Sequence, residues 1–355
     1  MIRRRFDNVV QTLHLSILFM IFFISIKPAL SQKAPIAKPN CNDTCGGVAI
    51  PYPFGTSENC YRGNVSFRLV CNETFDPPQL LLGNIPITEI NLDGQMRVMK
   101  LISRDCYNPN GTTAVRTRST TSLSRFLTVN NTANKFTIVG CDAYGYVSGR
   151  RLNRNFTTGC TAICDSIADL EEGSCMGSGC CQTSIPEFVS VLDIRLRSYS
   201  NYSDIRDFND CGFAFIVEEN SFKFSADNLT NFKNVSRLPM IIDWAIGNET
   251  CESAQMNLTS YACVSPNSTC YKPENGNGYR CRCPVGYQGN PYLINGCHDI
   301  DECEDEGVSK LCKHGCKNTE GGFYCPCPKG HRGDGKIGGD GCSPSNSITL
   351  KLVAG

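Results

Sequence analysis

The sequence predicts a mainly β, disulfide-rich protein in which a β-rich N-terminal domain precedes two small tandem modules of six cysteines each. The 24 cysteines all lie between residues 41 and 342, and an even number in an exported chain indicates a disulfide framework. Apolar and polar residues alternate in several short runs, which is the period of half-buried strands. Clusters of Asn, Gly, Pro and Ser separate these runs as turns.

The first 31 residues have the organisation of a secretory signal peptide. Three arginines precede an apolar run at 13–26, and small residues follow at 29–31. The run is shorter than the roughly 20 apolar residues of a membrane span, so cleavage near residue 31 is favoured over a retained signal anchor. The tail at 343–355 is interrupted by Lys351. We therefore expect an extracellular chain that is secreted as given, and a single-pass membrane protein only if a longer form carries a transmembrane helix.

Sequons for N-glycosylation agree with an exported chain, because their density predicts a heavily glycosylated surface. The twelve predicted acceptors are Asn42, Asn64, Asn72, Asn110, Asn130, Asn155, Asn201, Asn228, Asn234, Asn248, Asn257 and Asn267.

The region from Cys41 to Thr250 is long enough to bury a hydrophobic core. Period-two alternation predicts half-buried strands at 65–69, 136–138, 192–196 and 213–217. In the third of these runs, Asp193, Arg195 and Arg197 take the outward positions. A turn is expected at 108–111, and 167–172 can form one helical turn.

The cysteines after residue 250 form two sets of six, at 251–297 and 299–342, with His298 as the linker. In each set a single residue separates the fourth and fifth cysteines, and this spacing resembles EGF-like modules. Sequence alone leaves the pairing open. The resemblance implies that the first cysteine pairs with the third, the second with the fourth and the fifth with the sixth: Cys251–Cys270, Cys263–Cys281, Cys283–Cys297, Cys303–Cys316, Cys312–Cys325 and Cys327–Cys342.

The second module also resembles the calcium-binding type of EGF-like domain, through the run Asp299-Ile300-Asp301-Glu302-Cys303 and the later run from Cys316 to Cys327. Ca²⁺ takes six to eight oxygen ligands, so a short chain must supply both side-chain and backbone oxygens. The expected side-chain ligands are Asp299, Glu302 and Asn318, and the expected carbonyl ligands are Ile300, Thr319 and Gly322. The alternative is a module that kept the fold and lost the ion.

Three further motifs resemble the ectodomains of plant wall-associated receptor kinases. They are Cys41-x-x-x-Cys45-Gly-Gly-Val-Ala-Ile-Pro-Tyr-Pro-Phe-Gly55, Gly177-Ser-Gly-Cys-Cys-Gln-Thr-Ser-Ile-Pro186 and Gly286-Tyr-Gln-Gly-Asn-Pro-Tyr292. The resemblance implies a galacturonan-binding domain at 41–145 and a family cysteine-rich region at 146–250. It also implies cell-wall pectin or oligogalacturonides as partners, at the wall face of the cell. The family continues into a kinase, but this chain has no kinase motifs. We therefore expect no enzyme activity, and a chain that is a fragment, a truncated gene model or an ectodomain-only form.

A basic stretch between residues 97 and 154 is a candidate site for an anionic polymer, since the Arg fork suits carboxylates and Tyr144 and Tyr146 can stack on sugar rings. The alternative is a solvated surface whose charges are balanced by acidic residues elsewhere in the fold. The candidate ligands are Arg97, Lys100, Arg104, Arg116, Arg118, Arg150, Arg151 and Arg154.

The sequence gives less support to other functions. The large domain has no histidine, which excludes Ser-His-Asp and Cys-His nucleophilic catalysis there, although a carboxylate-only hydrolase stays open. The cysteine pairs are better explained by disulfides than by zinc. The net charge is +0, and we expect no nucleic-acid partner. The competing role is a protein-interaction ectodomain, in which the EGF-like pair binds a peptide or a partner receptor.

Overall fold

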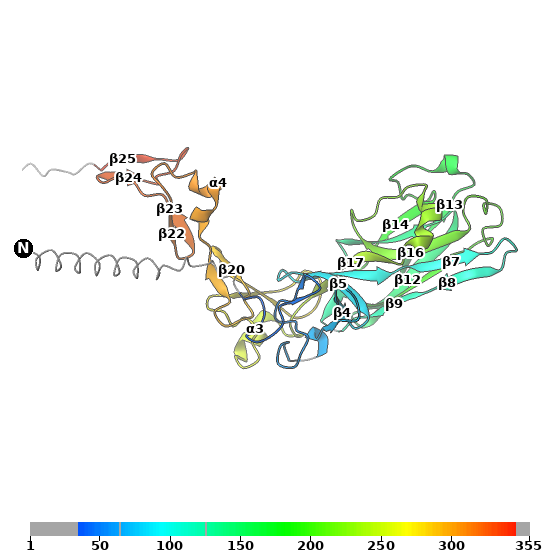
Figure 1. The fold of residues 1–355 in the computed structure, drawn as a ribbon, viewed down its shortest axis with the longest axis horizontal. Coiled ribbons are helices and arrows are strands. Elements are labelled where there is room, and N and C mark those ends of the chain that lie inside the picture. Colours follow the sequence, from blue (N-terminus) through cyan, green and yellow to red (C-terminus); the bar gives the residue numbers. More distant parts are fainter. Residues whose placement is uncertain (1–34, 64, 125, 346–355) are drawn as a thin grey trace, which may run out of the picture. The chain divides into compact units, whose positions relative to one another are not determined.

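The computed structural model describes residues 35–345, except 64 and 125. The signal peptide, the Asn64 sequon and residues 346–355 of the tail lie outside the described residues. Strands dominate the described part (Figure 1), and 12 disulfides brace the chain. The prediction of a mainly β, disulfide-rich fold is therefore confirmed. No helix among the described residues is long and apolar enough to cross a membrane.

Three antiparallel sheets build the large N-terminal region, and each is named here after one of its strands. The β17 sheet contains, in spatial order, β10 (Leu127–Val129), β17 (Arg237–Trp244), β6 (Gln95–Leu101), β5 (Ile85–Ile90), β4 (Gln79–Leu82) and β3 (Val70–Asn72). The β16 sheet contains β14 (Cys180–Ser184), β11 (Asn134–Val139), β16 (Cys211–Glu218), β7 (Ser103–Tyr107) and β8 (Thr113–Thr117). The β12 sheet contains β13 (Arg154–Ile163), β12 (Asp142–Arg151), β15 (Val189–Ser198) and β9 (Ser119–Ser122).

Short hairpins and single helical turns make up the other regular elements. The hairpins pair β1 (Thr44–Cys45) with β2 (Val48–Ala49), β18 (Thr269–Tyr271) with β19 (Arg280–Arg282), β20 (Tyr287–Gly289) with β21 (Cys297–Asp299), β22 (Lys317–Thr319) with β23 (Gly322–Tyr324), and β24 (His331–Gly333) with β25 (Cys342–Pro344). The helical elements are η1 (Val65–Phe67), η2 (Ile167–Asp169), α2 (Asn228–Asn231), η3 (Phe232–Asn234), α3 (Cys251–Met256), η4 (Glu302–Glu304) and α4 (Glu306–Ser309).

Strand β16, in the middle of its sheet, is buried on both faces. Its successive side chains point to opposite sides, so each face packs on a different part of the core. Ala214 and Ile216 belong to the same apolar cluster as Val147 and Ile194 of the β12 sheet. The odd-numbered aromatic residues of β16 instead pack with Phe222 and Phe232, on the segment that carries α2 and η3. The β12 sheet therefore has one face in the core and one face directed outward.

Most of the predicted strands are present, with two corrections. The runs at 136–138, 192–196 and 213–217 lie in β11, β15 and β16, but β16 is buried on both faces rather than half-buried. The run at 65–69 does not form a regular strand, since η1 occupies its first part and β3 begins at Val70. There the alternation reflects burial of Phe67 and Leu69, and Phe67 packs edge-to-face on Phe54.

The large region is one structural body rather than two successive domains. The predicted boundary between 145 and 146 falls inside β12, and β16 and β17 from the second range pair with β7 and β6 from the first. A cut there would break hydrogen-bonded strands in every sheet. Paired strands far apart in the chain, which local composition does not reveal, are the reason for this correction.

The predicted boundary at 250 is also bridged. Arg280 of the first EGF-like module is buried, and it donates through Nε to the Trp244 carbonyl (2.7 Å) and through its two terminal nitrogens to the Asp93 and Gly94 carbonyls (3.0 Å each). A Cβ on Gly94 would lie 2.0 Å from Arg280 Nε, so this approach requires a glycine. The first module is thus fastened to the large region through a buried cation.

All 24 cysteines lie in the described part, and they form disulfides with none left free. The two C-terminal modules contain the same six pairs that the EGF-like resemblance implies. The adjacent Cys180 and Cys181 bridge to separate partners, Cys175 and Cys160. The remaining bridges of the large region are Cys41–Cys60, Cys45–Cys71, Cys106–Cys211 and Cys141–Cys164.

Candidate binding surfaces and the candidate calcium site

The basic stretch of the sequence does not fold into one basic surface. Two of its residues lie on β6. Arg97 Nε donates to the Glu218 carboxylate at 2.7 Å. Lys100 is buried, and its Nζ donates to the Thr120 carbonyl at 2.6 Å. Burial, with a smaller contribution from the charge of Arg237, lowers the pKa of Lys100 to about 8. Both side chains are engaged inside the fold.

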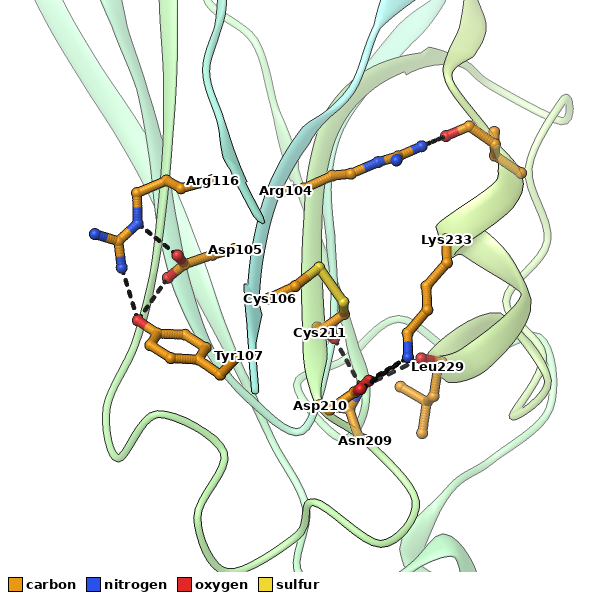
Figure 2. Close-up of a disulfide and its surroundings, with 11 residues drawn as sticks. Arg104, Asp105, Cys106, Tyr107, Arg116, Asn209, Asp210, Cys211, Leu229 and Lys233 are labelled. Carbon is orange, nitrogen blue, oxygen red and sulfur yellow. Dashed lines mark hydrogen bonds and ion pairs between the residues drawn. A yellow bond between two sulfur atoms is a disulfide. The ribbon is translucent and has the colours of Figure 1, made fainter. Parts of the chain in front are cut away.

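Three further candidates are also paired. Figure 2 shows Arg104 directed at a main-chain carbonyl, that of Val235, and Arg116 directed at Asp105 and Tyr107 of β7. Asp105 is fully buried, so the Arg116 guanidinium 2.6 Å away balances a carboxylate that has no access to water. Arg118 forms a bidentate ion pair with Asp193. For these residues the structure favours the balanced surface over a ligand site.

Arg150, Arg151 and Arg154 differ from the rest. They lie where β12 turns into β13, and all three are exposed. In the described part of the chain none of the three has an ion pair with an acidic side chain. The structure therefore brings three of the eight predicted basic ligands together at one hairpin and leaves the other five dispersed.

The outward face of the β12 sheet contains binding groups that sequence reasoning missed. On β12 this face presents Tyr144 and Tyr146, and the register places Arg197 and Arg195 of β15 directly opposite them. Tyr199 follows β15 and packs on Tyr144 with ring centroids 4.7 Å apart. The alternation at 192–197 already marked the arginines as outward-facing. Only strand pairing could show that they lie beside the tyrosines, about 50 residues earlier in the chain.

The turn that carries Tyr199 is held by Asp142, at the start of β12. The Asp142 carboxylate accepts hydrogen bonds from Ser198 Oγ (2.5 Å) and from the backbone N–H groups of Tyr199 (3.1 Å), Ser200 (3.0 Å) and Tyr202 (2.8 Å). Burial alone would raise the pKa of Asp142, but these donors lower it overall because they stabilise the carboxylate. The Tyr199 turn is thus fixed in place before any ligand arrives.

The family motifs at 41–55 and 286–292 meet in the fold. Asn290 is fully buried, and its Nδ2 donates to the carbonyls of Ile36 (2.8 Å) and Tyr52 (2.7 Å). Phe54 and Tyr292 both pack against the buried Trp244. Tyr52 and Phe54 are buried, so these rings serve packing rather than sugar contact.

The predicted calcium ligands lie where the two EGF-like modules join. Asp299 ends β21, which pairs with Tyr287 of the first module. Its carboxylate accepts from Asn318 Nδ2 (2.7 Å) and from the Gly321 N–H (2.5 Å) of the second module. The element that begins at Glu302, η4, lies against β22 and β23, the hairpin that carries Asn318, Thr319 and Gly322.

One atom of this set is unsatisfied by the protein. Glu302 Oε2 is buried and has no hydrogen-bond partner, which is costly for a carboxylate oxygen. No cluster of three or more His, Cys, Asp and Glu side chains that could hold a metal is found in the described residues, and the predicted set contains only two such side chains, Asp299 and Glu302. An orphaned carboxylate oxygen on η4, which packs on the hairpin that carries Asn318, fits an oxygen-ligated cation.

The sequons differ in accessibility. Asn130 is buried, and its Nδ2, the atom that would carry a glycan, donates to Asp243 at 2.9 Å. The structure therefore argues against glycosylation of Asn130. Asn72 and Asn228 are half-buried. The exposed acceptors are Asn42, Asn110, Asn155, Asn201, Asn234, Asn248, Asn257 and Asn267.

An apolar groove of about 760 Å³ lies between the segment 35–39 and the first EGF-like module. Tyr52, Tyr292 and Leu293 contribute to its lining, and the neighbouring Ile294 is 80% exposed. Lys38, Asp43 and Arg62 also line this groove, but its exposed surface is mainly apolar and suits a hydrophobic ligand.

Comparison with known proteins gives consistent matches. Residues 41–100 match the family described as "Wall-associated receptor kinase galacturonan-binding". Three proteins of Arabidopsis thaliana are similar over most of this chain. Wall-associated receptor kinase 2 is 40% identical over 84% of this chain and 39% of its own length. Wall-associated receptor kinase 1 is 37% identical over 83% of this chain and 40% of its own length. Wall-associated receptor kinase 5 is 36% identical over 89% of this chain and 42% of its own length. The chain thus spans about two fifths of the length of these relatives. No solved structure matches it.

Proposed function

Because this chain is homologous to the ectodomain region of the wall-associated receptor kinases, we propose that it binds homogalacturonan, the polyuronate of cell-wall pectin, and its oligogalacturonide fragments. The observation that carries the proposal is the match of residues 41–100 to the galacturonan-binding family. That ectodomain is extracellular, and we place the ligand at the wall face of the cell. In a longer form of the chain, such binding would report the state of the wall to a kinase.

Titration of the disulfide-bonded chain with polygalacturonate, followed by calorimetry, tests this function. We expect binding at low salt that is strongly weakened in about 1 M salt, where the screening length falls to about 3 Å. A fully methyl-esterified polymer is the matched control, because it keeps the sugar rings and lacks their charge. Equal binding of both polymers, or of neither, would contradict the proposal.

We also propose that the second EGF-like module binds Ca²⁺ through Asp299, Glu302 and Asn318, with the carbonyls of Ile300, Thr319 and Gly322 as further ligands. The orphaned Glu302 Oε2 supports the proposal. Asp299 pairs through its backbone with Tyr287 of the first module, and its carboxylate accepts from two groups of the second. An ion there would therefore stiffen the junction between the modules.

Calcium should raise the unfolding free energy of the chain by about 1.4 kcal/mol at a concentration tenfold above Kd. Extracellular sites of this kind have a Kd of about 10⁻⁴ to 10⁻³ M. Thermal unfolding with and without millimolar Ca²⁺ measures the effect, and Asp299→Asn should abolish it. Glu304→Gln, an exposed residue on the η4 turn that also carries Glu302, is the control that should keep the response. A response that survives Asp299→Asn would place the ion elsewhere.

The apolar groove favours a second candidate function, a protein-interaction ectodomain. Its lining would take a hydrophobic peptide rather than a polyuronate. Peptides selected from a random library on the intact chain should lose binding with Ile294→Asp. If the selected peptides ignore that substitution, the groove is not their site.

A further inference from the structure

The surface that holds the polyuronate can be located from the charges that remain free. Four cations lie within the matched range 41–100, and three are engaged: Arg62 donates to the Ser260 carbonyl, Arg97 to Glu218 and Lys100 to the Thr120 carbonyl. Only Arg68 is both exposed and without an ion pair there, among the described residues. One exposed cation is a poor match for a polymer with a carboxylate on every sugar.

The outward face of the β12 sheet has the opposite composition. Arg195 and Arg197 are exposed, and Arg118 and Arg150 lie on the same face. Two carboxylates share this face in the register. Asp193 is neutralised by Arg118 and Arg195, and Asp142 is buried and accepts hydrogen bonds from the Tyr199 turn. Arg197 has only a 3.3 Å bond to the Leu196 carbonyl, so its guanidinium is available to a ligand.

Aromatic rings stand between these cations. Tyr144 and Tyr146 are half-buried, and Tyr199 is 58% exposed. Gly159 of β13 lies opposite Tyr146, where a Cβ would come within 2.8 Å of the Tyr146 Cβ. Because Gly159 has no side chain, no group of β13 at this position covers the Tyr146 ring. Tyrosine rings that pack on the sheet and keep one side exposed to solvent give a rigid, amphipathic surface. Such a surface loses little side-chain entropy when a ligand binds.

We infer that this face, centred on Tyr144, Tyr146, Arg195 and Arg197, is the surface on which the chain holds a galacturonan, and the inference rests on the polyuronate binding proposed above. The guanidinium groups pair with uronate carboxylates, and the tyrosine rings lie against the apolar faces of the sugars. From Tyr144 to Arg150 the face is about 20 Å long at the usual strand rise. It therefore takes a run of several sugars rather than a single one.

The end of this face at the β12–β13 hairpin is less suitable for binding the polymer than the end that carries Tyr144. Asn155, an exposed sequon acceptor, lies directly opposite Arg150. A glycan on Asn155 would stand over Arg150 and the neighbouring Arg151 and Arg154. The half that carries Tyr144, Tyr146, Arg195 and Arg197 is away from Asn155, and the exposed acceptor Asn201 follows the Tyr199 turn that ends this half. We therefore place the centre of the site between the two acceptors.

The test compares charge-matched double variants of the full disulfide-bonded chain in calorimetric titrations with size-fractionated oligogalacturonides. Arg195→Gln with Arg197→Gln should weaken binding about tenfold, the expected sum of two partly exposed charge pairs. Arg68→Gln with Arg332→Gln removes the same charge at exposed positions elsewhere and should change affinity by less than about twofold. Tyr146→Ala should also weaken binding, whereas Tyr146→Phe should not.

Each outcome is decisive. Binding by the unaltered chain that both double variants retain equally overturns this surface and leaves the proposed function standing. No binding by the unaltered chain overturns the proposed function itself. Since Arg195 also pairs with Asp193, Arg197→Gln alone is the second variant, and its thermal unfolding should match that of the unaltered chain. A folded Arg197→Gln chain with unchanged affinity would count against the inference.

Discussion

Replacing Arg280 with Met is expected to lower the free energy of unfolding by about 3 to 5 kcal/mol, because it removes one partner of a buried charged network. The guanidinium satisfies three carbonyls of the large region and lies 3.8 Å from the Asp243 carboxylate. Met fills similar space but leaves these acceptors buried and unpaired. Urea-induced unfolding of the disulfide-intact chain measures the loss. Arg282→Met, two residues along the same strand and exposed, should cost less than about 1 kcal/mol.

The same variant should show a characteristic pH dependence. Burial raises the pKa of Asp243 above its ordinary 3.8, although Asn130 and Asn275 donate to it. Ionised Asp243 therefore opposes folding as the pH rises above that ordinary value, and the opposition grows when the cation is gone. The deficit of Arg280→Met relative to the unaltered chain should be larger at about pH 7 than at about pH 4. A deficit that is independent of pH would show that Arg280 acts through its carbonyl contacts alone.

Removing the Cys106–Cys211 bridge by a double replacement with Ala should lower stability by about 4 kcal/mol, or the melting temperature by roughly 10 °C. The bridge joins directly opposed residues of β7 and β16 and closes a loop with a sequence separation of 105 (Figure 2). The loop contains the whole β12 sheet. Bridges inside it already shorten the unfolded loop, so we expect slightly less than the full entropic effect.

The matched control is the double replacement of Cys175 and Cys180, which have a sequence separation of 5. The entropic model predicts about 2 kcal/mol for so short a loop. Thermal unfolding of both variants in the same buffer compares the two losses directly. Equal losses would mean that local strain or cavity formation, rather than loop closure, determines the contribution of these bridges.

The sequence predicted those features that depend on near neighbours in the chain. The EGF-like bridges follow from cysteine spacing and family resemblance, and residues from Asp299 to Gly322 are close in sequence as well as in space. The Asn108–Gly111 turn and the η2 turn likewise depend on local chemistry. In such cases the partners of each residue lie within a few tens of positions.

The basic stretch shows what the sequence could not predict. Arg97 is neutralised by Glu218, 121 residues away, and Arg118 by Asp193, 75 residues away. The carboxylates that neutralise these arginines lie outside the stretch, as the alternative interpretation in the sequence analysis required. The same long-range pairing placed Arg195 and Arg197 beside Tyr144 and Tyr146, which created a candidate surface that no local window contains.

The burial of Arg280 and Asn290 limits how this chain can be recombined. A chimera that replaces the first EGF-like module at residue 250 would remove both side chains from the carbonyls to which they donate in the large region. Exchange after Cys297 would keep these contacts intact. In a domain exchange, the large β-region and the first EGF-like module should therefore be moved together, because neither keeps these buried contacts alone.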